Sequence, residues 1–416
     1  MQRIFDKAII PIFLFVNLVL NGFLVGPLSV RIYFSLLLLF VISVSGFRPK
    51  LNSALLWYVL FVLFYFIALN INGEITEVDF GKYFLGRYLI CFIAAFAVQH
   101  YITRWEQLNS ILFFVVYLGV INGLVSTLQF IGVEQAFQIP FVLTSSEEHK
   151  DRFDLYSTLD SSLGVGVPGI FSSIFKNGYF TGLAAAFSLY MLRSARGLRL
   201  KTVYILIALF LFFVVYLSQQ RLVFYLTAMA YLYYFFKRQR AILIGAFMGL
   251  GIVSLGNSMN LFVEGSNLGR IGNYQDEDRL FLYSRAVVFI KGNFLFGGQH
   301  AAANFFINSG AVVQSAHNFI LNAFIYSGVF GAVSVILVFI KMINTSARMV
   351  IFRSNTNNIS FHIATGMLIY LLNSFAHNLS LVTGDEIIWI LFFMLLKAIS
   401  FEKQTISKKY ENNLSN

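Results

Sequence analysis

The sequence predicts an all-α, polytopic integral membrane protein with about 12 transmembrane helices. Of its 416 residues, 58% are hydrophobic and 12% are charged, and the mean hydropathy is +0.74. This composition is typical of membrane proteins and rare in soluble domains. Apolar runs recur along the whole chain at the length of about 20 residues that a helix needs to cross a hydrocarbon core. The short alternating segments of a membrane β-barrel are absent from the sequence.

Twelve apolar runs are the candidate spans. In chain order they cover 8–25, 31–47, 54–72, 83–100, 108–132, 168–192, 202–217, 222–236, 241–257, 317–340, 360–377 and 386–400. The first run follows a charged start and has no small-residue cleavage site, so we interpret it as a retained helix and not as a removed signal peptide. The single cysteine, Cys91, lies in the fourth run, and one cysteine cannot form an intrachain disulfide.

The charges between the runs alternate from one side to the other. One set of connections, together with both chain ends, holds 18 basic and 4 acidic residues, whereas the remainder of the chain holds 12 basic and 15 acidic residues. The positive-inside rule therefore predicts that both termini are cytoplasmic. The net charge of +11 reflects this topology and contact with anionic lipid. Nucleic acid is not an expected partner, because the basic runs are short and dispersed.

One transmembrane domain is expected over 1–400, with two long loops on the outer side. The first loop covers 133–167, and the second, larger loop covers 258–316. Within the second loop, 276–291 has the pattern of an amphipathic helix with Leu280, Tyr283, Val287 and Val288 on one face. The polar segment 401–416 is expected to be a disordered cytoplasmic tail. Because the outer loops are longer than the inner ones, we expect the functional site on the outer face.

The stretch SAHNFILNAFIYSGVFGAV, residues 315–333, carries the first candidate site residues. On a helix, Gly328 and Gly331 would follow His317 on or near the same face. His317 would then lie at the outer mouth of the bundle, and the glycines would let a neighbouring helix pack closely. The alternative is that His317 and Asn318 only cap a helix at the membrane interface.

Arginines on the outer side are the second group of candidates. Arg221 lies in a very short hairpin between the seventh and eighth runs, where it is either functional or extends toward headgroups. Arg279 and Arg285 lie in the amphipathic segment but would point in different directions. Arg279 follows the acidic run Asp276–Asp278, which is more simply a solvated helix start than a metal-binding D-x-D motif.

Three further cations, Lys82, Arg87 and Lys176, lie near the outer ends of spans, where they either hold a lipid phosphate or extend toward headgroups. A second His-Asn pair, His377-Asn378, is a secondary candidate. We predict no metal site and no cofactor.

The pattern H-N-x9-G-x-x-G, from His317-Asn318 to Gly328 and Gly331, resembles the signature of the O-antigen ligase and O-antigen polymerase superfamily. Arg279 and Tyr283 fit the family's R-L-x-x-Y loop helix, and Arg221 stands where the family has a mid-chain arginine. The stretch GIFSSIFKNGYFTGLAAAF, residues 169–187, also resembles a family segment. The likeness covers about 169–340. Gln219-Gln220 precede Arg221 where the family commonly has Ser or Thr.

The resemblance implies a GT-C-like, inverting glycosyltransferase of the bacterial inner membrane, with cytoplasmic termini and a periplasmic active site. It further implies that the enzyme uses undecaprenyl-pyrophosphate-linked oligosaccharides and neither a metal nor a nucleotide sugar. Membrane lipids and a chain-length regulator are the other expected partners.

The resemblance also suggests roles for the candidate residues. Arg221 and Arg279 would hold the leaving pyrophosphate, because guanidinium groups bind phosphate oxygens bidentately. His317 would act as general base, with Asn318 orienting the ring or the substrate. The expected substrate-binding residues are Arg285, Lys82, Arg87 and Lys176, and the expected structural residues are Gly328 and Gly331.

The same donor site serves two reactions. We favour an O-antigen (or capsule) polymerase, which transfers the glycan to a second lipid-linked repeat unit. An O-antigen ligase, which transfers the glycan to the lipid A core, is the alternative. A polysaccharide-lipid transporter or flippase is the alternative of another class, and the chain shows neither the internal repeat nor the mid-membrane charges typical of transporters.

Overall fold

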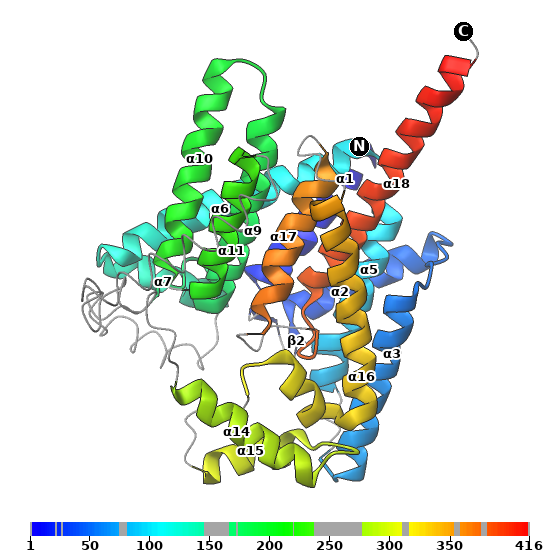
Figure 1. The fold of residues 1–416 in the computed structure, drawn as a ribbon, viewed down its shortest axis with the longest axis vertical. Coiled ribbons are helices and arrows are strands. Elements are labelled where there is room, and N and C mark those ends of the chain that lie inside the picture. The colour runs from blue at the N-terminus through cyan, green and yellow to red at the C-terminus, as the bar shows by residue number, and fades with distance from the viewer. Residues whose placement is uncertain are drawn as a thin grey trace.

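The computed structural model of the chain is helical, apart from one two-stranded hairpin (Figure 1). It describes residues 2–20, 23–25, 28–74, 81–144, 166–171, 174–218, 220–236, 277–309, 316–352, 358–375 and 381–414. The N-terminal half contains α1 (Gln2–Leu18), β1 (Leu24–Val25), β2 (Leu28–Ser29), α2 (Val30–Val44), α3 (Ser53–Ile71), the π-helix η1 (Gly81–Leu89), α5 (Ile90–Tyr101), α6 (Trp105–Phe130) and α7 (Glu134–Thr144). The C-terminal half contains α9 (Ile174–Ser194), α10 (Leu198–Leu217), α11 (Arg221–Phe236), α14 (Glu277–Gly292), α15 (Gln299–Asn308), α16 (Phe319–Ala347), the π-helix η4 (Arg348–Phe352), α17 (Ile359–Asn373) and α18 (Glu386–Leu414).

The helices confirm the all-α membrane class that the hydropathy predicts. Each predicted apolar run overlaps a helix except the ninth, 241–257, which lies outside the described residues. Within the described part of the chain, five helical stretches are long and apolar enough to cross a membrane: Ser53–Ile71, Tyr83–Tyr101, Trp105–Phe130, Leu198–Leu217 and Phe319–Ile351. Shorter apolar helices cover Lys7–Leu18, Val30–Val44, Leu222–Phe235 and Ile359–Asn373.

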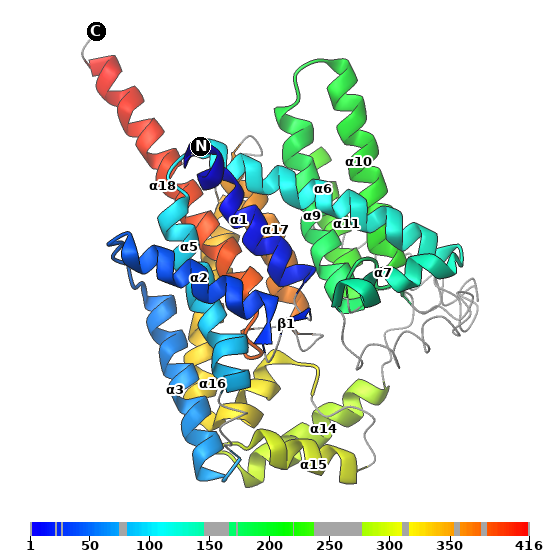
Figure 2. The same ribbon diagram turned by 180° about the vertical axis from the view of Figure 1, so that it is seen from behind.

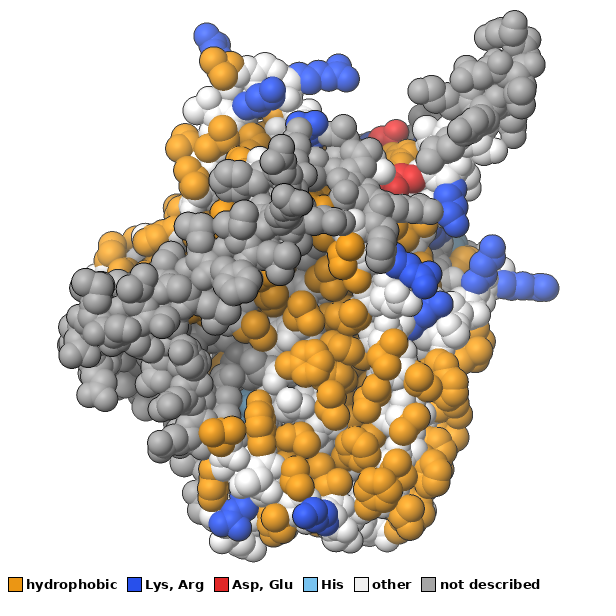
Figure 3. Space-filling model, viewed as in Figure 1, with side chains coloured by type: hydrophobic (Ala, Val, Ile, Leu, Met, Phe, Trp, Pro, Cys, Tyr) orange, Lys and Arg blue, Asp and Glu red, His pale blue; other side chains and the backbone are white. Residues whose placement is uncertain are grey.

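The two ends of the chain lie toward the same end of the molecule. α1 begins and α18 ends at the top of Figure 1, whereas α14 and α15 lie at the opposite end. Figure 2 shows the same arrangement from behind, with β1 and β2 near the middle of the molecule. In Figure 3, apolar side chains cover much of the surface on the side of α16, and many Lys and Arg side chains gather toward the upper end.

α9 is the central helix of the bundle and packs against α6, α10, α11 and α17. From Asn177 to Leu189 every one of its residues is buried. Small residues allow this: a Cβ on Gly182 would overlap Val223 of α11, so the two helices can approach only because this position is glycine.

A buried polar network fixes the segment that leads into α9. Asn177 donates to the Val167 carbonyl at 2.6 Å and accepts from Asn122 of α6 at 2.6 Å. The Gln129 side chain bonds the Gly169 N–H and carbonyl at 2.8 and 2.9 Å. Because buried polar groups cost free energy unless they are bonded, this network holds 166–171 against α6 within the bundle. It explains why the segment that enters α9 is rich in small and polar residues.

One expectation about the end of an element is wrong. Residues 401–414 continue α18 as a helix and are not a disordered tail. The helix is already nucleated by its apolar part, and each added Glu, Lys or Gln then extends it at little cost. α14 forms as predicted, over Glu277–Gly292. Its buried side carries Leu282, Ala286 and Phe289, whereas Leu280 is 66% and Val288 54% exposed.

Candidate active site

His317 and Asn318 lie just before α16 and not within it. Asn318 is the N-cap of the helix, and its Oδ1 accepts hydrogen bonds from the N–H groups of Ile320 and Leu321 at 3.0 and 3.2 Å. The cap alternative is therefore correct for Asn318. His317 has φ of 48°, a left-handed conformation that few residues other than glycine adopt. The helical-face argument for His317 is wrong, because the residue is outside the helix.

Gly328 divides α16 and receives the loop between α14 and α15. Its φ of 61° interrupts the helix, which frees the Ile325 carbonyl and the Val329 N–H. The loop between α14 and α15 binds both groups: Gly298 N donates to Ile325 O at 2.7 Å, and Val329 N donates to Phe294 O at 2.9 Å.

The two motif glycines have different roles. A Cβ on Gly328 would overlap the Leu295 carbonyl, so this glycine admits loop backbone and not, as expected, a neighbouring helix. A Cβ on Gly331 would overlap the Ser327 side chain of α16 itself and would lie 3.3 Å from the Cβ of Phe64, so this second glycine makes room for Ser327 as well as for α3.

The loop helix α14 is tied to the cap of α16 through α17. The Tyr283 hydroxyl donates to the Phe375 carbonyl at 3.5 Å, and Asn318 Nδ2 donates to the same carbonyl at 3.3 Å. Arg279 lies one helical turn before Tyr283, on the same face of α14. The side chain of Arg279 is outside the described atoms, and the shared carbonyl ties the helix that carries this residue to the cap of α16.

The Arg285 side chain packs against its own helix. Its guanidinium lies 5.0 Å from the ring centre of Phe281 on the same helix, a cation–π contact. Its Nε is buried and has no hydrogen-bond partner. The prediction that Arg279 and Arg285 face different directions agrees with their separation of six residues on a continuous helix.

The first turns of α9 connect His317 to the start of α11. The Phe175 and His317 rings lie with their centres 6.4 Å apart. One turn further, a Cβ on Gly178 would overlap Gln220, the residue that immediately precedes Arg221. Arg221 begins α11 directly after the short connection from α10, as predicted. Its side chain is outside the described atoms. The residue before it, Gln220, lies against the first turns of α9, where Phe175 contacts His317.

Two of the predicted cations, Arg87 and Lys176, share a cavity of about 250 Å³ that we call the charged cavity. Three charged residues that the sequence analysis did not select also line it: Arg31, Asp385 and Glu386. Arg31 lies in the first turn of α2, Asp385 immediately precedes α18 and Glu386 begins it, so each lies at the end of an apolar run. A charge at the end of an apolar run could have marked these residues as candidates. The sequence alone does not predict that residues more than 350 positions apart line one cavity. Lys82 lies in η1, and its side chain is outside the described atoms.

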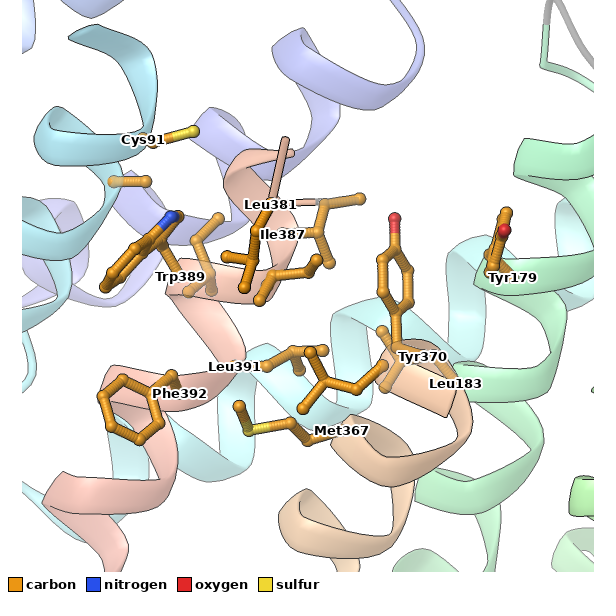
Figure 4. Packing of buried hydrophobic residues seen from close by; sticks show 14 of the residues in the cluster. Cys91, Tyr179, Leu183, Met367, Tyr370, Leu381, Ile387, Trp389, Leu391 and Phe392 are labelled. Carbon is orange, nitrogen blue, oxygen red and sulfur yellow. The ribbon is translucent and has the colours of Figure 1, made fainter. Parts of the chain in front are cut away.

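Neutral groups hold the charged side chains of the cavity in place. Arg31 donates to the Gly86 carbonyl, and the Arg87 guanidinium lies 4.5 Å from the ring centre of Tyr83. Asp385 accepts from the Tyr370 hydroxyl at 2.8 Å and from the Ile387 N–H at 3.0 Å. Figure 4 shows Tyr370 between Tyr179 of α9 and Ile387 at the start of α18.

Asp385 lies in the connection before α18, with 7% of its surface exposed. Burial, with a smaller contribution from the adjacent charge of Glu386, raises the pKa of its carboxyl group to about 7. Close to neutral pH, Asp385 can therefore exist with or without its proton.

The end of α17 joins the cavity to the His317 segment. Tyr370 lines the cavity, while the Phe375 carbonyl, five residues on, accepts the bonds from Tyr283 and Asn318. Similarly, Phe175 contacts His317 and the next residue, Lys176, lines the cavity. The two groups of candidate residues are therefore neighbours.

Some predicted residues lie outside the described part of the chain. They are the second pair His377-Asn378, the first acidic residue Asp276 and most of the loop 133–167, of which α7 is described up to Thr144. No protein-family model matches the chain, and a search of curated proteins finds no match to it.

Proposed function

We propose that the protein is a membrane glycosyltransferase that polymerises undecaprenyl-pyrophosphate-linked repeat units on the periplasmic face. The observation that supports this most is the shared bond at Phe375, since it brings the helix of Arg279 to the cap that carries His317. A base and a phosphate-binding arginine are the two groups that such a transfer needs at one place.

In the proposed reaction, His317 takes the proton of an acceptor sugar hydroxyl. The hydroxyl oxygen forms a bond to the anomeric carbon of the donor sugar, and the bond between that carbon and the pyrophosphate oxygen breaks. The electron pair leaves with the lipid pyrophosphate, whose added charge Arg221 and Arg279 stabilise. Attack opposite the leaving group inverts the anomeric centre. The chemistry uses the side chains of this chain and proceeds without a nucleotide sugar.

The conformation of His317 suits a general base, because the residue lies outside α16 and is held in place by its neighbours. Its left-handed backbone is fixed by the Asn318 cap on one side and by the Phe175 ring on the other. Strained backbone at a single non-glycine residue is common at functional sites. Neutral imidazole near pH 7 can accept the proton that the sugar hydroxyl loses.

A deletion strain tests the proposal against the ligase alternative. On a lipopolysaccharide gel, a strain without a polymerase shows the core with a single repeat unit. A strain without a ligase shows bare core, while polymer accumulates on the lipid carrier. The proposal predicts the first pattern, and restoration of the full ladder by the plasmid-borne gene. The second pattern would assign the chain to ligation.

The charged cavity supports one candidate of another class, a transporter of lipid-linked glycans. Buried ionisable residues such as Asp385 and Lys176 are typical of transport pathways. Purified protein in vesicles separates the two functions. A transporter moves a fluorescent lipid-linked oligosaccharide between leaflets and leaves its length unchanged, whereas a polymerase lengthens it.

A further inference from the structure

The charged cavity has more cationic than anionic side chains, and the contacts that hold its two arginines are with neutral groups. Arg31 is bonded to a backbone carbonyl and Arg87 lies against an aromatic ring, so neither of these contacts is with a carboxylate. Together with Lys176 they contribute three positive charges to the wall, against two carboxyl groups. Asp385 already accepts two hydrogen bonds from its own surroundings. The wall therefore favours an anionic ligand.

We propose that the charged cavity binds the pyrophosphate of a second lipid-linked oligosaccharide, with Arg31, Arg87 and Lys176 as its cationic partners. The inference rests on the proposed function, and it extends that function to the acceptor. A polymerase acts on two lipid-linked pyrophosphates at once, whereas a ligase needs only the donor. One pyrophosphate is assigned to Arg221 and Arg279 at the His317 segment, and the second requires its own cations.

The size of the cavity fits the anionic head of such a substrate and not its glycan. Sites for drug-sized ligands enclose about 300–1,000 Å³. The charged cavity encloses about 250 Å³, so it has room for a pyrophosphate and leaves the attached sugars outside. Arginine is suited to this role because its fork binds two phosphate oxygens at once.

The position of the cavity fits an acceptor. Tyr370 in the cavity and Phe375 at the His317 segment are five residues apart at the end of α17. Lys176 and Phe175 are adjacent in sequence and face the cavity and His317, respectively. A sugar attached to a pyrophosphate in the cavity would therefore begin next to the segment that carries the base.

The first experiment counts pyrophosphate sites on the purified full-length chain in neutral-lipid nanodiscs, with radiolabelled inorganic pyrophosphate as the probe. Two sites per chain are expected. Lys176→Met should weaken binding at one of them by roughly tenfold or more, because it removes a charge-assisted contact of about 1.4 kcal/mol or more. Lys176→Arg should retain the site. Lys291→Met, which removes an exposed lysine at the end of α14, is the charge-matched control and should bind as the wild type does.

A variant that binds pyrophosphate more tightly than the wild type distinguishes a change in the site from misfolding. Asp385→Asn removes a negative charge from the cavity wall, so at pH 8 it should bind pyrophosphate more tightly than the wild type does. Unchanged affinity in both Asp385→Asn and Lys176→Met would overturn the site.

Competition identifies the source of the anion. Undecaprenyl pyrophosphate in the nanodisc should displace the label from the cavity, whereas phosphatidylglycerol in its place should not. Displacement by phosphatidylglycerol would make the cavity a headgroup site and overturn the proposal. The binding assay needs no turnover. If the chain has a single site that Lys176→Met does not affect, the second site is overturned even if polymer forms. If the chain has two sites but makes no polymer, the proposed function is overturned instead.

Discussion

Tyr283 and Asn318 donate hydrogen bonds to the same carbonyl oxygen, that of Phe375, over 3.5 and 3.3 Å. One residue belongs to the loop helix α14 and the other caps α16, so the two hydrogen bonds hold the loop helix against the start of a long apolar helix. The two sequence patterns that carry the family likeness, R-L-x-x-Y and H-N, meet at this point. The end of α17 is the common support for both.

Asn318 has a capping role and a bridging role that mutation can separate. Asn318→Ala should lose both and destabilise the chain by about 0.5–2 kcal/mol, the usual cost of losing an N-cap. Asn318→Asp keeps the acceptor that caps α16 but cannot donate to Phe375. It should therefore unfold near the wild-type temperature and still lose activity. Thermal unfolding in detergent and polymer synthesis, measured on the same preparations, test this; equal losses of stability in both variants would contradict it.

Arg279→Lys should fail as a catalyst although it preserves the charge. A lysine ammonium is a point charge and cannot reproduce the bidentate fork. By analogy with the loss of one oxyanion-hole donor, the variant should cost about 2.7–4 kcal/mol of transition-state stabilisation. Arg285→Lys is the matched control, since Arg285 packs on Phe281 of its own helix. Single-turnover rates decide: full activity of Arg279→Lys with loss in Arg285→Lys would exchange the two assignments.

Gly328→Ala should destabilise the chain markedly. An alanine at φ of 61° is strained, and its Cβ would overlap the Leu295 carbonyl, so the loop between α14 and α15 would have to move. We expect a loss of roughly 1–3 kcal/mol, the usual scale of such backbone strain. Gly292→Ala, where a Cβ meets nothing within 4 Å, is the control and should be close to neutral. Urea unfolding of the two variants compares them, and equal midpoints would contradict the account.

Hydropathy predicted most of the bundle, because burial in lipid leaves a strong signal in every helix that crosses it. It placed Arg221 at the start of α11 and a helix at the R-L-x-x-Y motif. Periodicity failed where backbone hydrogen bonds with a distant segment decide the local conformation. Neither the left-handed backbone at His317 nor the entry of the 294–298 loop at Gly328 can be read from the stretch that contains them.

The charged cavity could not be predicted from the sequence, for a different reason. Arg87 and Lys176 were selected as separate cations near span ends, and nothing local to either one indicates Asp385 as a neighbour. Only the folded chain brings η1 and the starts of α2 and α9 to the segment before α18, where these residues line one cavity. Charges at the outer ends of apolar runs were the available signal, and they do not specify which ends meet.

Stability should depend on pH through Asp385. The pKa of its carboxyl group is about 3.9 in an unfolded chain, and burial raises it to about 7 in the folded protein. Between these values the folded state binds more protons than the unfolded state, so stability falls as pH rises from about 4 to about 7 and then levels off. Asp385→Asn should lack this fall. Unfolding temperatures from pH 4 to pH 8 compare the two proteins, and parallel curves would contradict the raised pKa.

The central claim is that His317 is the base of a transfer between lipid-linked glycans, and one measurement tests it most directly. Purified wild type and His317→Ala are each incubated with a synthetic lipid-linked repeat unit, and the products are separated by length. A general base contributes about 10²–10⁴-fold to rate. The account predicts a polymer ladder from the wild type and a rate lower by that factor from the variant, with lipid-linked substrate bound equally by both. A His317→Ala protein that makes polymer at the wild-type rate would contradict it.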